Sequence, residues 1–314
     1  MEIRTKGQRQ PPWLLTSYGV GNDKHSFYNV VENRFHVTSI PELRGKYICA
    51  STYGWLVLVN PSGDCCIWNP ESMEKIELPN LPYPLDYTNC VLSKPPRDPD
   101  CYILFTSDSC RTFCQVGVDN EFFIEQLEAG GWFRIMSVAT FKGNIYGILK
   151  DSFVTVHFVD GALELRPIEP WKFPHHLSAY YHARYKDYMI ESPCKDELLL
   201  VHQFYSTSYR YNVFGFKIYR LDMCKMECEE LESIGDRAIF LSGRGGGECC
   251  FSTEGIKANC IYYTELNGRK LHVYDLNDNG KTLLLPCPAA RRSQSVNFWI
   301  EHQISQKFVN TKSK

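Results

Sequence analysis

The run Gly243–Glu248, with the sequence GRGGGE, is the stretch of this chain that comes closest to a phosphate-binding loop. A P-loop needs a Lys and then a Ser or Thr directly after its last Gly, because the Lys binds phosphates and the hydroxyl binds Mg²⁺. Here the residues Glu-Cys-Cys follow the glycines, which places a carboxylate where an anion would bind. We therefore interpret this run as a β-turn, whose glycines supply positive φ angles, and predict no nucleotide site.

Cysteines are the next candidates for chemistry, because Cys110–Cys114 and Cys224–Cys228 have a spacing compatible with zinc. A structural zinc site combines such a pair with a second Cys pair or with a His pair, and neither pair has a partner at that spacing. The adjacent cysteines 65–66 and 249–250 point to opposite faces of a strand and cannot chelate together. We predict buried, reduced thiols, no bound metal and no other cofactor.

Catalytic patterns are the third kind of chemistry, and we predict none. The chain contains no Gly-x-Ser-x-Gly nucleophile motif. Its paired carboxylates, Asp196-Glu197 and Glu229-Glu230, lie at the margins of expected strands, where solvated turns are usual. A glycosidase would need two carboxyl groups about 5 to 9 Å apart in one pocket, and nothing in the sequence favours a particular pair. The chain is therefore predicted not to be an enzyme.

Residues 169–186 form a Pro-containing stretch with too many large aromatic side chains to be entirely core. Loops on a rigid scaffold concentrate binding residues, and aromatic side chains dominate binding hot spots. We predict that this loop contributes to a partner-binding face through Trp171, Phe173, His175, His176, Tyr180 and Tyr181. The Tyr-rich loop Phe204–Tyr211 is a second candidate for the same role.

The elements that position these residues are predicted to be strands. Short apolar runs rich in Tyr, Phe, Val and Ile alternate with Gly, Asn, Asp and Pro, which is typical of strands and turns. The chain has 19 Tyr and 18 Phe, and aromatic residues suit a pleated, half-buried surface. Only 41–45 and 222–232 are candidates for a turn of helix, so the predicted fold class is all-β.

Grouping the strands predicts a β-propeller. Sets of four strands occupy 47–78, 89–127, 135–168, 187–234 and 238–285, where 238–253 is taken as one strand. Each set spans about 35 to 50 residues, the length of a propeller blade. We expect 26–31 and 34–39 to pair with 296–302 in a composite blade that closes the ring, which makes five or six blades. A pair of β-sandwiches is the alternative fold.

Trp55 and Trp68 lie within strands, and we expect them to pack between blades rather than to bind a partner. The predicted propeller covers 13–302. Residues 1–12 and 303–314 are polar ends that we expect to be disordered tails.

An ordered series of motifs resembles the plant F-box-associated propeller family, also known as domain of unknown function 295 and as the KIB-type β-propeller. The series runs through Tyr53–Val57, Trp68–Pro70, Phe141–Tyr146, Tyr188–Glu191, Phe216–Asp222, Ser233–Leu241, Asn259–Tyr263 and Val273–Leu276. The resemblance extends over about residues 12 to 302.

This resemblance implies a propeller that captures the substrate of an SCF-type ubiquitin ligase, next to an N-terminal F-box that docks on the ligase adaptor. About a dozen residues precede Trp13, without the Leu-Pro helical pattern of an F-box, so we expect no direct adaptor binding. The predicted function is non-catalytic binding of a protein partner. The alternatives are an enzyme or small-ligand binder that uses the central channel, and a gene whose upstream F-box exon is lost or whose function has decayed.

The overall charge argues against two other classes of partner. The formal net charge is −2 and the pI about 6.5, so no general positive field draws the chain to nucleic acid or an anionic membrane. No stretch approaches the roughly 18 apolar residues of a membrane span, and the N-terminus lacks the apolar core of a signal peptide. With its many cysteines, the chain is predicted to be cytoplasmic or nuclear.

Overall fold

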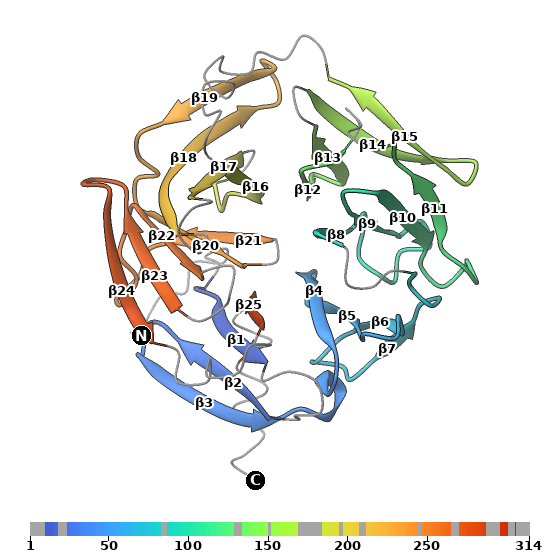
Figure 1. The fold of residues 1–314 in the computed structure, drawn as a ribbon, viewed down its shortest axis with the longest axis horizontal. Coiled ribbons are helices and arrows are strands. Elements are labelled where there is room, and N and C mark those ends of the chain that lie inside the picture. The colour runs from blue at the N-terminus through green and yellow to red at the C-terminus, as the bar shows by residue number, and fades with distance from the viewer. Residues whose placement is uncertain are drawn as a thin grey trace, which may run out of the picture.

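The fold is taken from a computed structural model. It describes residues 10–17, 24–82, 87–128, 134–149, 152–168, 184–194, 197–206, 212–243, 246–264, 270–286, 296–300 and 305. Within these residues six β-sheets are arranged radially around a central axis, as Figure 1 shows. The chain is therefore an all-β, six-bladed propeller, and the prediction of a propeller is confirmed with the higher of the two blade numbers.

Blades 2 to 5 are simple antiparallel meanders whose first strand is innermost. Blade 2 consists of β4 (Tyr47–Thr52), β5 (Trp55–Val59), β6 (Cys65–Trp68) and β7 (Lys75–Glu77). Blade 3 consists of β8 (Asn89–Leu92), β9 (Tyr102–Thr106), β10 (Cys110–Gln115) and β11 (Phe123–Gln126). Blade 4 consists of β12 (Ser137–Phe141), β13 (Asn144–Ile148), β14 (Phe153–Val159) and β15 (Ala162–Pro167). Blade 5 consists of β16 (Arg184–Glu191), β17 (Leu198–Tyr205), β18 (Val213–Asp222) and β19 (Glu227–Leu231).

Blade 1 closes the ring with strands from both ends of the propeller. It consists of β25 (Val296–Ile300), β1 (Trp13–Ser17), β2 (Lys24–Asn29) and β3 (Arg34–Ser39). β1 and β25 pair antiparallel, with Leu14 opposite Trp299. The predicted composite blade is confirmed, and β1 is a strand of it that the sequence pattern did not indicate.

Blade 6 departs from the meander. Its sheet order is β21-β20-β22-β23-β24, built from β20 (Arg237–Leu241), β21 (Gly247–Phe251), β22 (Cys260–Thr264), β23 (Lys270–Asp275) and β24 (Gly280–Pro286). The stretch 238–253, predicted as one strand, is a hairpin of β20 and β21, and β20 runs parallel to β22. The hairpin places β21 innermost, next to the central axis (Figure 1).

One turn device recurs at the end of the third strand in several blades. The Oδ1 atom of Asn69 accepts hydrogen bonds from the backbone N–H groups of the second and third residues after it. Asn29 and Asp222 do the same in blades 1 and 5. Asx side chains that bond the backbone ahead of them favour turns over continued strands. The residues 222–232, a candidate helical turn, form such a turn and then β19, whereas 41–45 contain a 3₁₀ turn over Pro41–Leu43.

Within the described residues the core consists of six apolar clusters, each between two neighbouring blades. Trp68 is buried in the cluster between blades 1 and 2, and Trp55 in that between blades 2 and 3. The prediction that both pack between blades is confirmed. The radial arrangement follows from this burial, since each sheet is covered on both faces only when a blade stands on either side. The two predicted tails fall almost entirely outside the described residues.

Candidate functional site

Residues 169–183 of the predicted partner-binding loop lie outside the described residues, whereas 184–186 belong to β16 and are strand rather than loop. All six of the predicted binding side chains fall within 169–183: Trp171, Phe173, His175, His176, Tyr180 and Tyr181. The C-terminal part of the second candidate loop, 207–211, also lies outside the described residues. The structure nevertheless places the ends of both segments together, because Arg184 at the start of β16 pairs with Tyr205 at the end of β17. Two stretches that the sequence separates therefore leave blade 5 at the same end.

Aromatic side chains gather at this end of blade 5. The ring of Phe204 lies 6.4 Å from that of Tyr185 and 6.1 Å from that of Phe214, measured between centroids. Phe204 is buried, whereas Phe214 is 55% exposed. We call Tyr185, Phe204 and Phe214 the aromatic end of blade 5. An exposed Phe stacked on a buried ring offers apolar contact area to a binding partner.

A buried acid–imidazole pair lies under the aromatic end. Asp187 Oδ1 and His202 Nδ1 are hydrogen-bonded, and each side chain is 2% exposed. The imidazole also makes edge-on contacts with Tyr185 at 5.8 Å and with Tyr219 at 5.1 Å. These contacts tie β16, β17 and β18 together and make the base of the aromatic end rigid.

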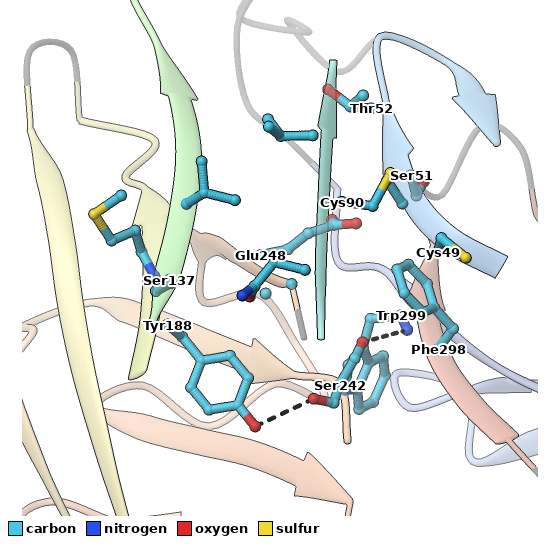
Figure 2. A pocket seen from close by; sticks show the side chains of 17 residues that line it. Cys49, Ser51, Thr52, Cys90, Ser137, Tyr188, Ser242, Glu248, Phe298 and Trp299 are labelled. Carbon is cyan, nitrogen blue, oxygen red and sulfur yellow. Dashed lines mark hydrogen bonds between the residues drawn. The ribbon is translucent and has the colours of Figure 1, made fainter. Parts of the chain in front are cut away.

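A second site lies on the central axis, where a cavity of about 130 Å³ is surrounded by all six blades. Its lining comes from the innermost strands β4, β8, β12, β16, β21 and β25 and from the turn that precedes β21. Figure 2 shows the side chains that converge on it. Pockets for drug-sized ligands measure about 300 to 1,000 Å³, so this cavity suits only a small chemical group.

Several polar groups of this lining join blades to one another. The Tyr188 hydroxyl lies 3.1 Å from Gln203 Oε1 and 3.2 Å from the Ser242 carbonyl oxygen. The backbone N–H of Trp299 donates to Ser242 Oγ at 3.0 Å, and its indole N–H donates to the Leu241 carbonyl at 3.1 Å. Burial raises the pKa of Tyr188 well above its usual value, so its hydroxyl stays protonated. These bonds connect blades 5, 6 and 1 around the cavity.

Glu248 is the only side chain with a full charge among the described residues that line the cavity. It is half-buried on β21, and Figure 2 shows it extending into the cavity toward the side formed by β4 and β8. The sequence analysis treated this carboxylate only as an argument against a phosphate site. No sequence signal could have placed it on the axis, because its position depends on the additional strand of blade 6.

The Gly-rich run that contains Glu248 connects the antiparallel strands β20 and β21. The Ser242 N–H donates to the Gly246 carbonyl at 3.1 Å, and Gly246 has a φ of +73°. Gly247 and Glu248, predicted as part of a β-turn, are instead the first two residues of β21, and 244–245 lie outside the described residues. Cys110, Cys114, Cys224 and Cys228 are free thiols, and no group of His, Cys, Asp and Glu with metal-binding geometry occurs in the described part of the chain. That part also contains no helix long and apolar enough to cross a membrane.

Six radial blades around a narrow axial cavity define the chain as a β-propeller. Comparison with known families identifies it further. The chain belongs to the KIB1-4 beta-propeller family, which it matches over residues 27–275. This family membership confirms the resemblance seen in the sequence motifs.

One relative is an F-box protein of Arabidopsis thaliana, 33% identical over 94 residues, or 30% of this chain. The match spans about a quarter, 24%, of that relative's length. Among solved structures, hydrazine synthase of Kuenenia stuttgartiensis aligns at a TM-score of 0.42 and 10% identity, over 91% of this chain and 99% of that one. The N-terminal domain of Nup159 aligns at 0.40 and 11%, over 94% and 86%.

Proposed function

We propose that this propeller captures a protein partner without catalysing a reaction, as the substrate-binding part of an F-box-type ubiquitin-ligase receptor does. The proposal is supported by membership of the KIB1-4 family and by the partial match to an F-box protein. The observation that carries it is the aromatic end of blade 5, where the exposed Phe214 stacks on the buried ring of Phe204, beside the described ends of both aromatic segments. We infer that this end of the blade contacts the partner.

A non-catalytic role fits the axial cavity better than the alternative, a channel enzyme. A general acid–base mechanism needs two groups whose proton affinities are set apart by their surroundings. Glu248 is the one carboxylate in the described lining, and burial raises the pKa of the Cys90 and Tyr188 side chains, which keeps both protonated. Reduced thiols, present at the cysteines of the described residues, support a cytoplasmic or nuclear site of action.

Affinity purification from the native tissue, followed by mass spectrometry, tests this function. We expect the wild-type chain to enrich a defined partner, and the variants Phe214→Ala and Trp171→Ala to recover at least ten-fold less of it. Val118→Ala is the matched control, because Val118 is an equally exposed apolar residue, 58% accessible, on blade 3. Equal recovery of the partner by all variants would mean that the partner does not contact this end of blade 5. Recovery of the ligase adaptor would contradict the expectation that this chain does not bind it directly.

A further inference from the structure

The buried Asp187–His202 pair is not explained by a need for stability. Its two side chains are each 2% exposed and are hydrogen-bonded to each other. Nε2 of His202 is buried as well, and it has no hydrogen-bond partner within the described residues. Burying polar atoms is unfavourable compared with burying apolar ones, and apolar side chains of similar volume often replace a buried ionisable pair without loss of stability. We therefore expect the contribution of this pair to be geometric.

The imidazole of His202 makes ring contacts with three strands of blade 5. Its centroid is 6.4 Å from that of Phe204, which lies two residues further along β17. The rings of Tyr185 on β16 and Tyr219 on β18 meet it edge-on, at 5.8 and 5.1 Å. The plane of this imidazole therefore determines how the aromatic rings of the three strands pack against one another.

Asp187 fixes the plane of that imidazole. It lies opposite His202 in the pairing of β16 with β17, and its Oδ1 atom is hydrogen-bonded to Nδ1 of the ring. Apolar contacts have no preferred direction, whereas a hydrogen bond restricts the angle at which the ring can lie. A carboxyl group on one ring nitrogen is a common means by which proteins orient a functional imidazole. The pair supplies a directional constraint that an apolar pair would not supply.

Phe214 depends on the ring beneath it, because it is the extra residue of a β-bulge. In the pairing of β17 with β18, Phe204 lies opposite Gly215 and Tyr205 lies opposite Val213, so no residue of β17 lies opposite Phe214. A bulge leaves its extra residue outside the ladder and changes the direction of its side chain. The ring of Phe214, 55% exposed, stacks instead on that of Phe204 at 6.1 Å. The direction of Phe214 therefore follows from the position of the Phe204 ring.

We propose that His202, oriented by Asp187, is a positioning residue for partner capture, because it sets through Phe204 the direction in which Phe214 meets the partner. This inference rests on the proposed capture of a protein partner and identifies the residues that preorganise its binding surface. A side chain that is already held in its binding orientation loses less conformational freedom on association. Loss of the Asp187–His202 pair should therefore weaken capture although Phe214 itself is still present.

The orientation of Phe214 can be measured without the partner. In fluorine NMR spectra of the chain labelled with para-fluorophenylalanine, Phe214→Leu identifies the resonance of this residue. We expect that resonance to move more than halfway to the shift of the free amino acid in Asp187→Val/His202→Leu, which removes the directional hydrogen bond. It should stay in place in the conservative variant Asp187→Asn, because an amide oxygen can still accept a hydrogen bond from the imidazole. The resonance of Phe123, 40% exposed on blade 3, is the control and should not move in either variant.

The double variant must be folded for this comparison, and urea denaturation checks this. We expect its midpoint to be close to that of the wild type, since apolar side chains replace an ionisable pair. If the double variant does not fold, Phe204→Leu serves instead, because it removes the ring between the imidazole and Phe214 and should move the same resonance. An unchanged Phe214 resonance in the variant that is used would overturn the proposal.

Capture of the partner that the wild type enriches separates this inference from the proposed function. We expect the double variant to recover about ten-fold less of that partner, and Asp187→Asn to recover as much as the wild type. Full recovery by the double variant would overturn the positioning role and leave partner capture intact. An equal loss in Asp187→Asn would mean that the charge of the pair matters and not its geometry, and the positioning role would be wrong. Recovery of nothing by the wild type would overturn the proposed function, while the fluorine spectra still test the positioning.

Discussion

Arg237 on blade 6 forms an ion pair with Glu197 on the turn between the first two strands of blade 5. The two side chains are 11% and 13% exposed. Arg237 also donates to Ser192 Oγ at 2.9 Å and to the Ile234 carbonyl at 2.8 Å. A guanidinium group with three kinds of acceptor from two blades fixes how those blades meet. It lies in Ser233–Leu241, the longest of the motifs on which the resemblance to the family was based.

Removing one partner of this ion pair should therefore lower the free energy of unfolding. Arg237→Met leaves a largely buried carboxylate without its cation, and we expect a loss of about 3 kcal/mol in the free energy of unfolding. The double variant Arg237→Met/Glu197→Leu should lose less than the sum of the single variants. Urea denaturation measures both. Arg220→Met, which breaks the exposed pair with Glu229, is the control and should change stability by less than about 1 kcal/mol.

Trp55 tests the packing between blades 2 and 3. Its side chain is 5% exposed within a cluster that includes Ile103 and Phe105 of the neighbouring blade. Trp55→Ala should destabilise the chain by about 3 to 5 kcal/mol, because the cavity left behind cannot collapse completely. Val118→Ala on the surface should be nearly neutral. An unchanged thermal melting curve for Trp55→Ala would contradict the inter-blade position of this side chain.

Gly247 tests the close approach of blades 5 and 6 at the cavity. A Cβ atom at this position would lie 2.7 Å from Ile190 Cδ1 and 3.0 Å from the Phe240 carbonyl oxygen. Gly247→Ala should therefore lower the free energy of unfolding by about 1 to 3 kcal/mol, because the added methyl group overpacks this contact. Gly215→Ala is the matched control, since its Cβ would meet only Tyr274 Oη at 3.9 Å. Chemical denaturation should rank the two variants in this order; a reversed ranking would mean that the two blades are further apart.

The stability that Asp275 contributes to the fold should depend on pH, and the direction of this dependence can be predicted. A hydrogen bond from the Lys257 ammonium, with others from Asn277, lowers the pKa of Asp275 from its usual 3.8. Because the pKa of Asp275 is lower in the folded than in the unfolded state, its ionised form stabilises the fold above about pH 4. This stabilisation is lost as the pH falls through the lowered pKa. The stability difference between wild type and Asp275→Asn should thus shrink on acidification, as urea midpoints between about pH 3 and pH 7 will show.

Thiol reactivity should separate Cys224 from the buried cysteines of the described residues. Burial raises the pKa of Cys101 to about 11 and those of Cys114 and Cys249 to about 12. These thiols stay protonated near neutral pH and react slowly, because the thiolate is the nucleophile. Cys224 is exposed. In the folded chain, a thiol reagent should modify Cys224 first, and Cys224→Ser should remove that fast phase. Fast modification of Cys114 would mean that blades 2 and 3 open readily.

The candidate sites show where prediction from the sequence stopped. The sequence pointed to the aromatic loops 169–186 and 204–211 as separate features, and only the pairing of Arg184 with Tyr205 shows that both leave the same end of blade 5. Glu248 received no functional interpretation, because a single carboxylate after a glycine run has no meaning until its neighbours are known. The Asp187–His202 pair was equally invisible, since the two residues meet across strands and not along the chain.

By itself the sequence determined the local structure of this protein: aromatic and β-branched runs of strand length, turns with Gly, Asn and Asp, and their repetition in sets of four. These properties depend on neighbouring residues, so a pattern can report them. The number of blades, the strand β1, the β20–β21 hairpin and the axial cavity were decided only by tertiary structure. Each depends on pairing and packing between residues far apart in the chain, such as Leu14 with Trp299, and no local pattern specifies which distant strand a strand will join.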